Sequence, residues 1–127
     1  MPKLGHNIKK IKTSRFDGVM KFGEIEKTEL TNVYVEKFYP SGYIMSDNTY
    51  QADGSGGGDS IIPDGLCPPS RIHSLLDWLK FCRESSNKIS LVNYTTDDKG
   101  NCTMTATCSL EDGRKWFAVA ISEYEYY

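Results

Sequence analysis

The most informative absences in this sequence are those of long apolar runs, of histidine and of catalytic motifs. None of the apolar runs in the 127 residues approaches the roughly eighteen residues that a membrane-spanning helix needs. The basic start of the chain has no apolar stretch behind it, so we expect no secretory signal and a soluble, cytoplasmic protein. The two histidines, His6 and His73, stand in no hydrolase or zinc-protease motif. A small enzyme without a recognisable motif stays open only as an alternative.

The four cysteines are also spaced in a way that excludes a familiar site. No pair has C-x-x-C spacing, which argues against a zinc knuckle or a redox motif. Cys102 and Cys108 lie on one predicted strand, about 20 Å apart at strand rise, which is too far for a disulfide. A Cys67–Cys82 bridge is possible but unsupported, so we expect reduced thiols, no metal and no cofactor.

Charge is unevenly distributed along the chain. The first fifteen residues contain five basic side chains and no acid, whereas the formal net charge of the chain is −2. The sequence predicts a basic arm over residues 1–15, possibly mobile, on an acidic body. A basic arm can contact phosphates, but no aromatic residues alternate with the basic ones, so nucleic acid is an unfavoured partner.

Three hydrophobic patterns predict an α+β fold in one domain, residues 1–127. Residues 19–27 and 32–39 alternate as strands do, and a Pro-Ser-Gly turn leads into a third, YIMS, which together make a meander. Pro68, Pro69 and Ser70 predict the start of a helix over about 70–85. Its apolar stripe, which should pack on an antiparallel sheet, consists of Ile72, Leu75, Leu76, Leu79 and Cys82. Phe81 points away from this stripe and is available to a second layer or a partner.

The C-terminal third predicts a β-hairpin. Cys102–Leu110 alternates apolar and hydroxyl side chains, and Asp112-Gly113 favours a type I′ turn. That turn pairs Cys108 with Phe117, Ala106 with Val119 and Met104 with Ile121, which makes one apolar face that we expect in the core. The opposite face is flat and hydroxylated, with Thr105 opposing Ala120, Thr107 opposing Ala118, and Trp116 at its end. Residues 88–95 should add a third strand.

Residues 52–66 form a glycine-rich segment between the meander and the helix. Five glycines and three aspartates in QADGSGGGDSIIPDGL could form a calcium loop, but Gly57 at position five of such a loop has no side-chain oxygen. We therefore expect a flexible connector.

The function that the sequence favours is protein–protein contact by a non-catalytic intracellular protein, of an inhibitor, immunity or virus-encoded accessory type. The partner would be another protein or a second copy in a homodimer, with no role for a membrane. The alternative is a small-molecule-binding protein with a pocket at the sheet face or at a dimer interface. Because Trp and Tyr dominate many interfaces, the candidate binding residues are Trp116, Phe81, Tyr124, Tyr126, Thr105 and Thr107.

Overall fold

The computed structural model describes residues 7–58, 60–69, 75–84 and 88–127. The elements are β1 (Ile8–Lys21), β2 (Glu24–Phe38), β3 (Ile44–Gln51), α1 (Leu75–Glu84), β4 (Ile89–Thr96), β5 (Cys102–Glu111) and β6 (Arg114–Tyr126). The six strands form one antiparallel sheet in the order β3-β2-β1-β6-β5-β4. The chain is therefore mostly β with one short helix. No described helix is long and apolar enough to cross a membrane.

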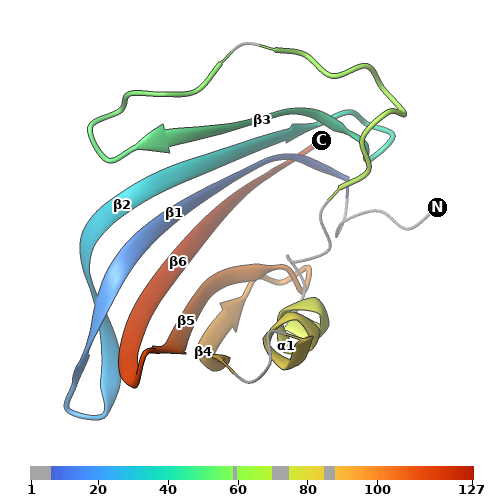
Figure 1. Ribbon diagram of the computed structural model, residues 1–127. Helices are drawn as coiled ribbons and strands as arrows, with labels where there is room; N and C mark the ends of the chain where they lie inside the picture. Colours follow the sequence, from blue (N-terminus) through green and yellow to red (C-terminus); the bar gives the residue numbers. More distant parts are fainter. Residues whose placement is uncertain (1–6, 59, 70–74, 85–87) are drawn as a thin grey trace.

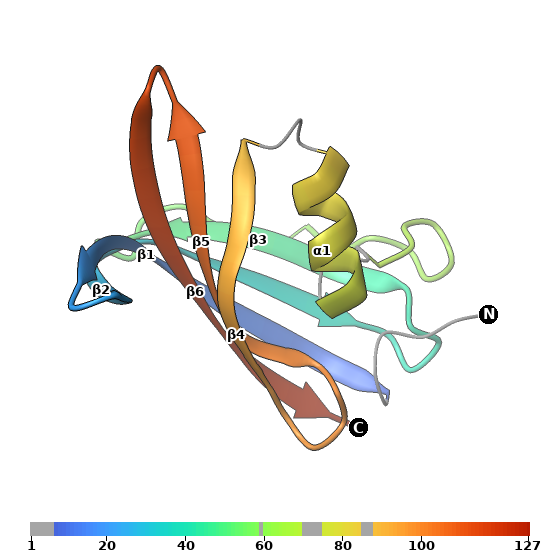
Figure 2. The same cartoon turned by 90° about the horizontal axis from the view of Figure 1, so that it is seen from below.

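The sheet is strongly curved, and α1 lies beside β4 on the concave side (Figures 1 and 2). The chain builds this sheet from two halves. β1, β2 and β3 form an antiparallel meander, and β6 returns along β1 and continues through β5 to β4. The strand that begins the chain and the strand that ends it therefore pair in the middle of the sheet.

The C-terminal hairpin has the predicted register. Cys108 pairs with Phe117, Ala106 with Val119 and Met104 with Ile121, as the Asp-Gly turn requires. The turn residues Asp112 and Gly113 have φ angles of 51° and 75°, the left-handed conformation of a type I′ turn. β4 confirms the third strand that was predicted over 88–95.

The N-terminal half differs from the prediction in two places. The stretch predicted as a strand over 19–27 contains the β1–β2 turn, where Phe22 and Gly23 have φ angles of 52° and 81°. Residues 8–15, expected to belong to a basic arm, form the first part of the central strand β1. Lys10 alternates with buried Ile11 and reaches Glu125 across the sheet at 3.5 Å. Lys10 and Lys12, two of the lysines that suggested a solvated arm, belong to the outward row of this strand.

The main cluster of buried apolar side chains lies at one end of the concave face, and the predicted hairpin face is buried only in part. The residues in the core cluster are 0–4% exposed and come from β1, β2 and β3: Ile8, Ile11, Phe38 and Ile44. Tyr124 and Tyr126 pack against them from β6. Of the predicted core face, Ala106 and Val119 are buried, whereas Met104, Cys108, Phe117 and Ile121 remain partly exposed.

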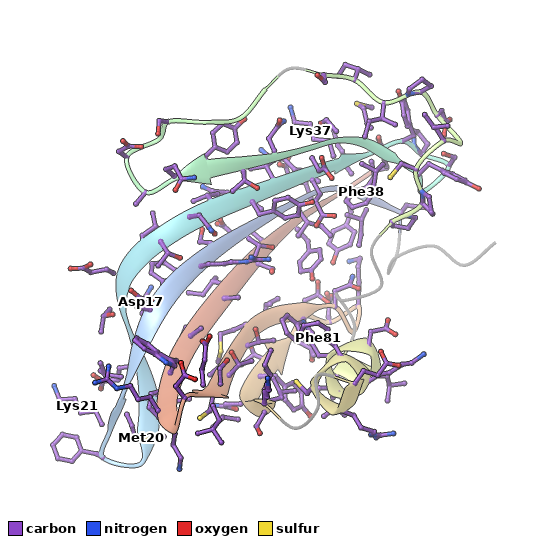
Figure 3. The ribbon with its side chains drawn as sticks, in the orientation of Figure 1. Asp17, Met20, Lys21, Lys37, Phe38 and Phe81 are labelled. Atoms are coloured by element: carbon purple, nitrogen blue, oxygen red, sulfur yellow. The ribbon has the colours of Figure 1, made fainter. Side chains whose placement is uncertain are left out.

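The predicted packing of the helix through its leucine stripe is not confirmed. Leu76 is 78% exposed and Leu79 is 42% exposed, whereas Cys82 is buried. Residues 70–74 and 85, which the prediction included in the helix, lie outside the described residues, and Ile72 is among them. Phe81, which Figure 3 shows on the helix, is partly buried. Trp78 is also partly buried, and both side chains border the space between the helix and the sheet.

The described part of the glycine-rich segment follows the outer edge of β3. Gly57 N donates to Thr49 O at 3.0 Å, and further along Ile62 N donates to Met45 O at 2.7 Å. A Cβ on Gly57 would lie 2.4 Å from the ring of Tyr50, and the φ of this glycine is +81°. Glycine is therefore required here to let the chain approach the strand. The segment connects two elements and also covers a sheet edge that would otherwise expose free backbone groups.

Candidate ligand-binding cavity

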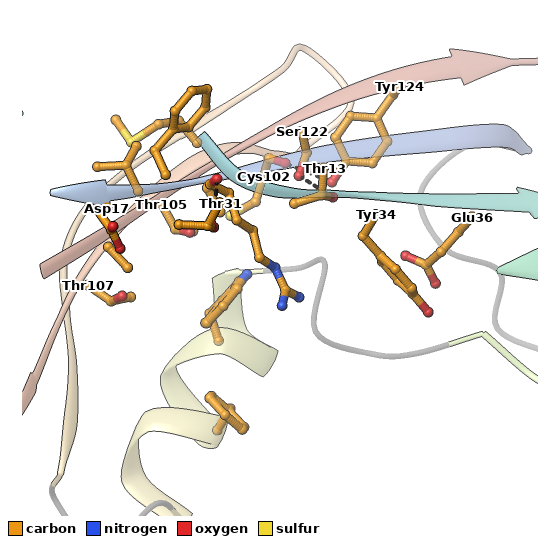
Figure 4. Close-up of a pocket in the computed structure, with 18 residues that line it drawn as sticks. Thr13, Asp17, Thr31, Tyr34, Glu36, Cys102, Thr105, Thr107, Ser122 and Tyr124 are labelled. Carbon is orange, nitrogen blue, oxygen red and sulfur yellow. Dashed lines mark hydrogen bonds between the residues drawn. The ribbon is translucent and has the colours of Figure 1, made fainter. Parts of the chain in front are cut away.

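A cavity of about 500 Å³ lies between the concave face of the sheet and α1 (Figure 4). Strands β1, β2, β5 and β6 contribute its floor, and α1 contributes Trp78 and Phe81. Volumes of this size are typical of sites that hold small organic ligands. The cavity begins where the apolar core cluster ends, because the inward side chains change there from large and apolar to small and polar.

The floor of the cavity is the hydroxyl face that the hairpin register predicted. Thr105 and Thr107 on β5 oppose Ala120 and Ala118 on β6, so the floor consists of small side chains. One strand further, the hydroxyls of Thr13 and Ser122 lie 3.0 Å apart. Small residues leave the space empty, and the hydroxyls present hydrogen-bonding atoms along it.

One end of the cavity carries a phenol and a carboxylate from β2, Tyr34 and Glu36. Glu36 is 1% exposed, and Tyr34 Oη donates a hydrogen bond to Asp47 Oδ2 at 3.1 Å. Burial, and then the nearby carboxylates of Glu36 and Asp47, raise the pKa of Tyr34 above its usual range. Tyr34 therefore stays protonated at neutral pH, and because its one O–H is donated to Asp47, its oxygen is left to accept a hydrogen bond.

The opposite wall is aromatic. The rings of Trp78 and Phe81 on α1 pack edge to face, with centroids 5.8 Å apart and planes at 88°. Aromatic surfaces of this kind contact flat apolar groups, while the floor across from them supplies polar atoms. Arg15 and Asp17 on β1 are exposed and border the cavity, so both signs of charge are present at its margin.

Two tyrosines of β6 join the cavity to the loop between β4 and β5. Tyr124 Oη donates to Cys102 O at 2.7 Å, and burial raises the pKa of this phenol. Tyr126 Oη donates to Asp97 Oδ2 and accepts from Asn101 Nδ2 at 3.0 Å. Burial and the hydrogen bond to Asp97 raise the pKa of Tyr126 to about 12. These bonds hold the far end of β6 in place beneath the cavity.

The cavity has a thiol at its border that is not activated for covalent chemistry. Cys102 borders it, but burial raises the pKa of this thiol, which disfavours the nucleophilic thiolate. All four cysteines are free. No histidine is among the described residues that border the cavity, and His6 and His73 lie outside the part of the chain that the structure describes.

Four of the six candidate residues from the sequence border this cavity: Phe81, Tyr124, Thr105 and Thr107. Tyr126 belongs to the hydrogen-bond network beside it. Trp116 lies apart, 55% exposed near the β5–β6 turn. The sequence analysis missed Arg15, Tyr34 and Glu36, because the β1–β2 pairing that brings them to the concave face depended on recognising residues 8–15 as a strand.

The glycine-rich segment does not present a metal site among its described residues. Asp53 Oδ1 accepts from the backbone N–H of Ser55 at 2.9 Å and from its hydroxyl at 2.6 Å. These bonds lower the pKa of Asp53 and direct its carboxylate into a local turn. Across residues 7–58, 60–69, 75–84 and 88–127, no group of three or more His, Cys, Asp and Glu side chains could hold a metal ion.

Comparisons with known proteins identify no family: no protein-family model, no curated protein sequence and no solved structure matches the chain significantly.

Proposed function

We propose that this protein binds a small organic molecule in the cavity between the concave face of the sheet and α1. The observation that carries the proposal is the combination of an aromatic wall with a hydroxylated floor around about 500 Å³ of space. Ligand sites in proteins combine a largely apolar lining with a few converging polar groups in this way. Phe81, Thr105, Thr107 and Tyr124 would contact the ligand.

The lining favours a ligand that is partly flat and partly polar. Trp78 and Phe81 would contact a ring or another flat apolar group. Thr105, Thr107 and the phenol of Tyr34 would hydrogen-bond its polar atoms. One cation, Arg15, and two carboxylates, Asp17 and Glu36, border the cavity, a combination suited to a neutral, zwitterionic or cationic ligand more than to an anion.

The two tryptophans provide a direct test, because Trp78 borders the cavity and Trp116 does not. Trp116→Phe leaves Trp78 as the single reporter, and Trp78→Phe leaves Trp116 as its matched control. The probes are nucleosides, sugars, amino acids and aromatic carboxylates, screened by melting temperature and then by fluorescence titration.

At least one compound should raise the melting temperature and change the emission of the Trp78 reporter, while the Trp116 control stays constant. Ala118→Phe, which fills part of the cavity from an exposed position on β6, should weaken binding without unfolding the protein. The proposal fails if no probe binds and native mass spectrometry of protein purified from cells finds no bound small molecule. It also fails if a ligand changes the fluorescence emission of Trp116 and leaves that of Trp78 unchanged.

Protein–protein contact, the function that the sequence favoured, is a second proposal. Exposed apolar side chains at the ends of both long hairpins support it: Phe22 is 96% exposed, Leu110 is 49% exposed and Trp116 is 55% exposed. Trp116→Ala should leave the melting temperature nearly unchanged and should abolish capture of the protein partner. No observation favours the inhibitor, immunity or viral forms of this function over one another.

A further inference from the structure

The outer, convex face of the sheet carries a second set of apolar side chains. Directly paired residues of antiparallel strands share a face, and successive residues alternate between faces. The row opposite to Thr105 and Ala120 therefore points outward from the cavity. We call six of its apolar members the outer patch: Phe16, Met104, Ala106, Phe117, Val119 and Ile121. The sheet is one layer thick, so Phe16, Met104 and Val119 also border the cavity at its floor.

The outer patch is tightly assembled within the sheet. Gly18 pairs with Phe117, and a Cβ on Gly18 would lie 2.9 Å from Ile25 Cγ2 and 3.2 Å from Phe117 Cβ. The ring of Phe16 lies under the ammonium of Lys27, 4.7 Å from its centroid. Neighbouring side chains thus bury Val119 and Ala106, at 6% and 4% exposure, while the ring of Phe117 stays partly exposed.

No described segment of the chain covers this patch. β1, β5 and β6 contact their neighbours within the sheet, and the helix contacts β4. Figures 1 and 2 show α1 and the glycine-rich segment away from the convex side of these strands. Apolar sheet faces in proteins are normally buried against a second layer. The missing layer must come from outside the described fold.

The charges along β6 are arranged symmetrically about its apolar middle. The outward row of β6 reads Lys115, Phe117, Val119, Ile121, Glu123, so it is basic at one end, apolar in the middle and acidic at the other. Lys115 and Glu123 stand at equal distances from Val119 along the strand. A two-fold axis near Val119, perpendicular to β6, would place Lys115 opposite Glu123 of the partner subunit at both ends of the contact. A row with this symmetry is complementary to itself.

We propose that the outer patch is the interface of a homodimer, in which two copies stack sheet on sheet with antiparallel β6 strands. Such a contact is isologous, and sheets of the same twist stack face to face at about 10 Å. Glu123 is free to take part, because its side chain is 70% exposed and its ion pair with Lys12 is long, at 4.0 Å. The dimer leaves the concave cavity open, so this inference is independent of the proposed ligand.

A charge swap tests the dimer without disturbing the apolar patch. The full chain is examined by sedimentation over a wide range of protein concentrations. Lys115→Glu would place like charges together twice in the dimer and should raise its dissociation constant at least about tenfold. Lys115→Glu combined with Glu123→Lys re-creates both pairs in reverse and should restore dimerisation. Lys80→Glu, the same charge change at an exposed position of α1, serves as the matched control and should have no effect.

Circular dichroism checks that each variant is folded. We expect it to be, because the substituted residues are exposed. Wild-type protein that sediments as a monomer at every concentration would overturn the proposal. A dimer whose dissociation constant is unchanged by Lys115→Glu would also overturn the proposal, because its interface must then lie elsewhere. A weakened single variant that the second substitution fails to restore would show that Lys115 and Glu123 do not meet, and would overturn the antiparallel arrangement.

Discussion

Phe38→Ala should be among the most destabilising single substitutions in this protein. The ring is 1% exposed and packs among Ile8, Ile11 and Ile44 at the closed end of the concave face. Truncating a fully buried phenylalanine costs about 3–5 kcal/mol, because transfer free energy is lost and a cavity remains. With an unfolding entropy of about 2.1 cal/mol/K per residue, the melting temperature should fall by roughly 10–20 °C.

Phe117→Ala is the matched control, because the sequence analysis placed Phe117 in the core and the structure places it on the outer patch. Its ring is partly exposed, so truncation should cost about 1–2 kcal/mol. Denaturant unfolding measured at low and high protein concentration separates the loss within one chain from any loss of dimer contacts. If Phe117→Ala costs as much as Phe38→Ala at low concentration, the core does not lie where the structure places it.

Two further predictions concern pH and the glycine-rich segment. Burial and the bond to Asp97 raise the pKa of Tyr126 to about 12 from its ordinary value of 10.0. This phenol therefore stabilises the fold fully below pH 10 and loses that contribution as pH rises towards 12. Ultraviolet titration should show tyrosines that ionise only together with unfolding; full ionisation near pH 10 in a folded protein would contradict the network. Gly57→Ala should destabilise the protein by about 1–3 kcal/mol, because its Cβ would meet the ring of Tyr50, whereas Gly54→Ala meets no atom within 4 Å and bears only the backbone strain. Equal losses in chemical denaturation would mean that the segment does not lie against β3.

The C-terminal hairpin was predictable because its information is local. A strict alternation of threonine with apolar residues and an Asp-Gly turn between two strands determine the register, and every predicted pair occurs. The same pattern could not determine which of the two faces points inward. The size and low polarity of its side chains favoured the apolar face as the inward one. The curvature of the sheet instead puts Thr105 and Thr107 inside, facing α1. Curvature depends on bulges and on strands from elsewhere in the chain, which a hairpin sequence does not contain.

The N-terminal strand β1 was not predictable by the same reasoning, because its many basic residues obscure the alternation of apolar and polar positions that indicates a strand. Lysines at positions 10 and 12 suggested a solvated arm, but they pair with Glu125 and Glu123 on a neighbouring strand more than a hundred residues away in sequence. Once β1 is placed, Tyr34 and Glu36 on β2 also reach the cavity. The polar end of the candidate site thus depends on long-range pairing, and a single sequence does not reveal it.

We propose an occupant for each face of this sheet, a small ligand on the concave face and a second copy of the chain on the convex face. The concave face has small side chains, hydroxyls and an aromatic wall around empty space, which is the chemistry of a small ligand. The convex face has closely packed apolar side chains, which is the chemistry of a macromolecular contact. Because the sheet is a single layer, Val119 and Phe16 belong to the outer patch and also border the cavity floor. A ligand that stiffens the floor would therefore also order the surface on which a second copy packs. Ligand binding should then lower the dissociation constant of the dimer. By linkage, dimerisation should lower the dissociation constant of the ligand by the same factor. Sedimentation of the wild-type protein with and without a compound found in the melting screen would measure that coupling, and an unchanged dissociation constant would show that the two faces act independently.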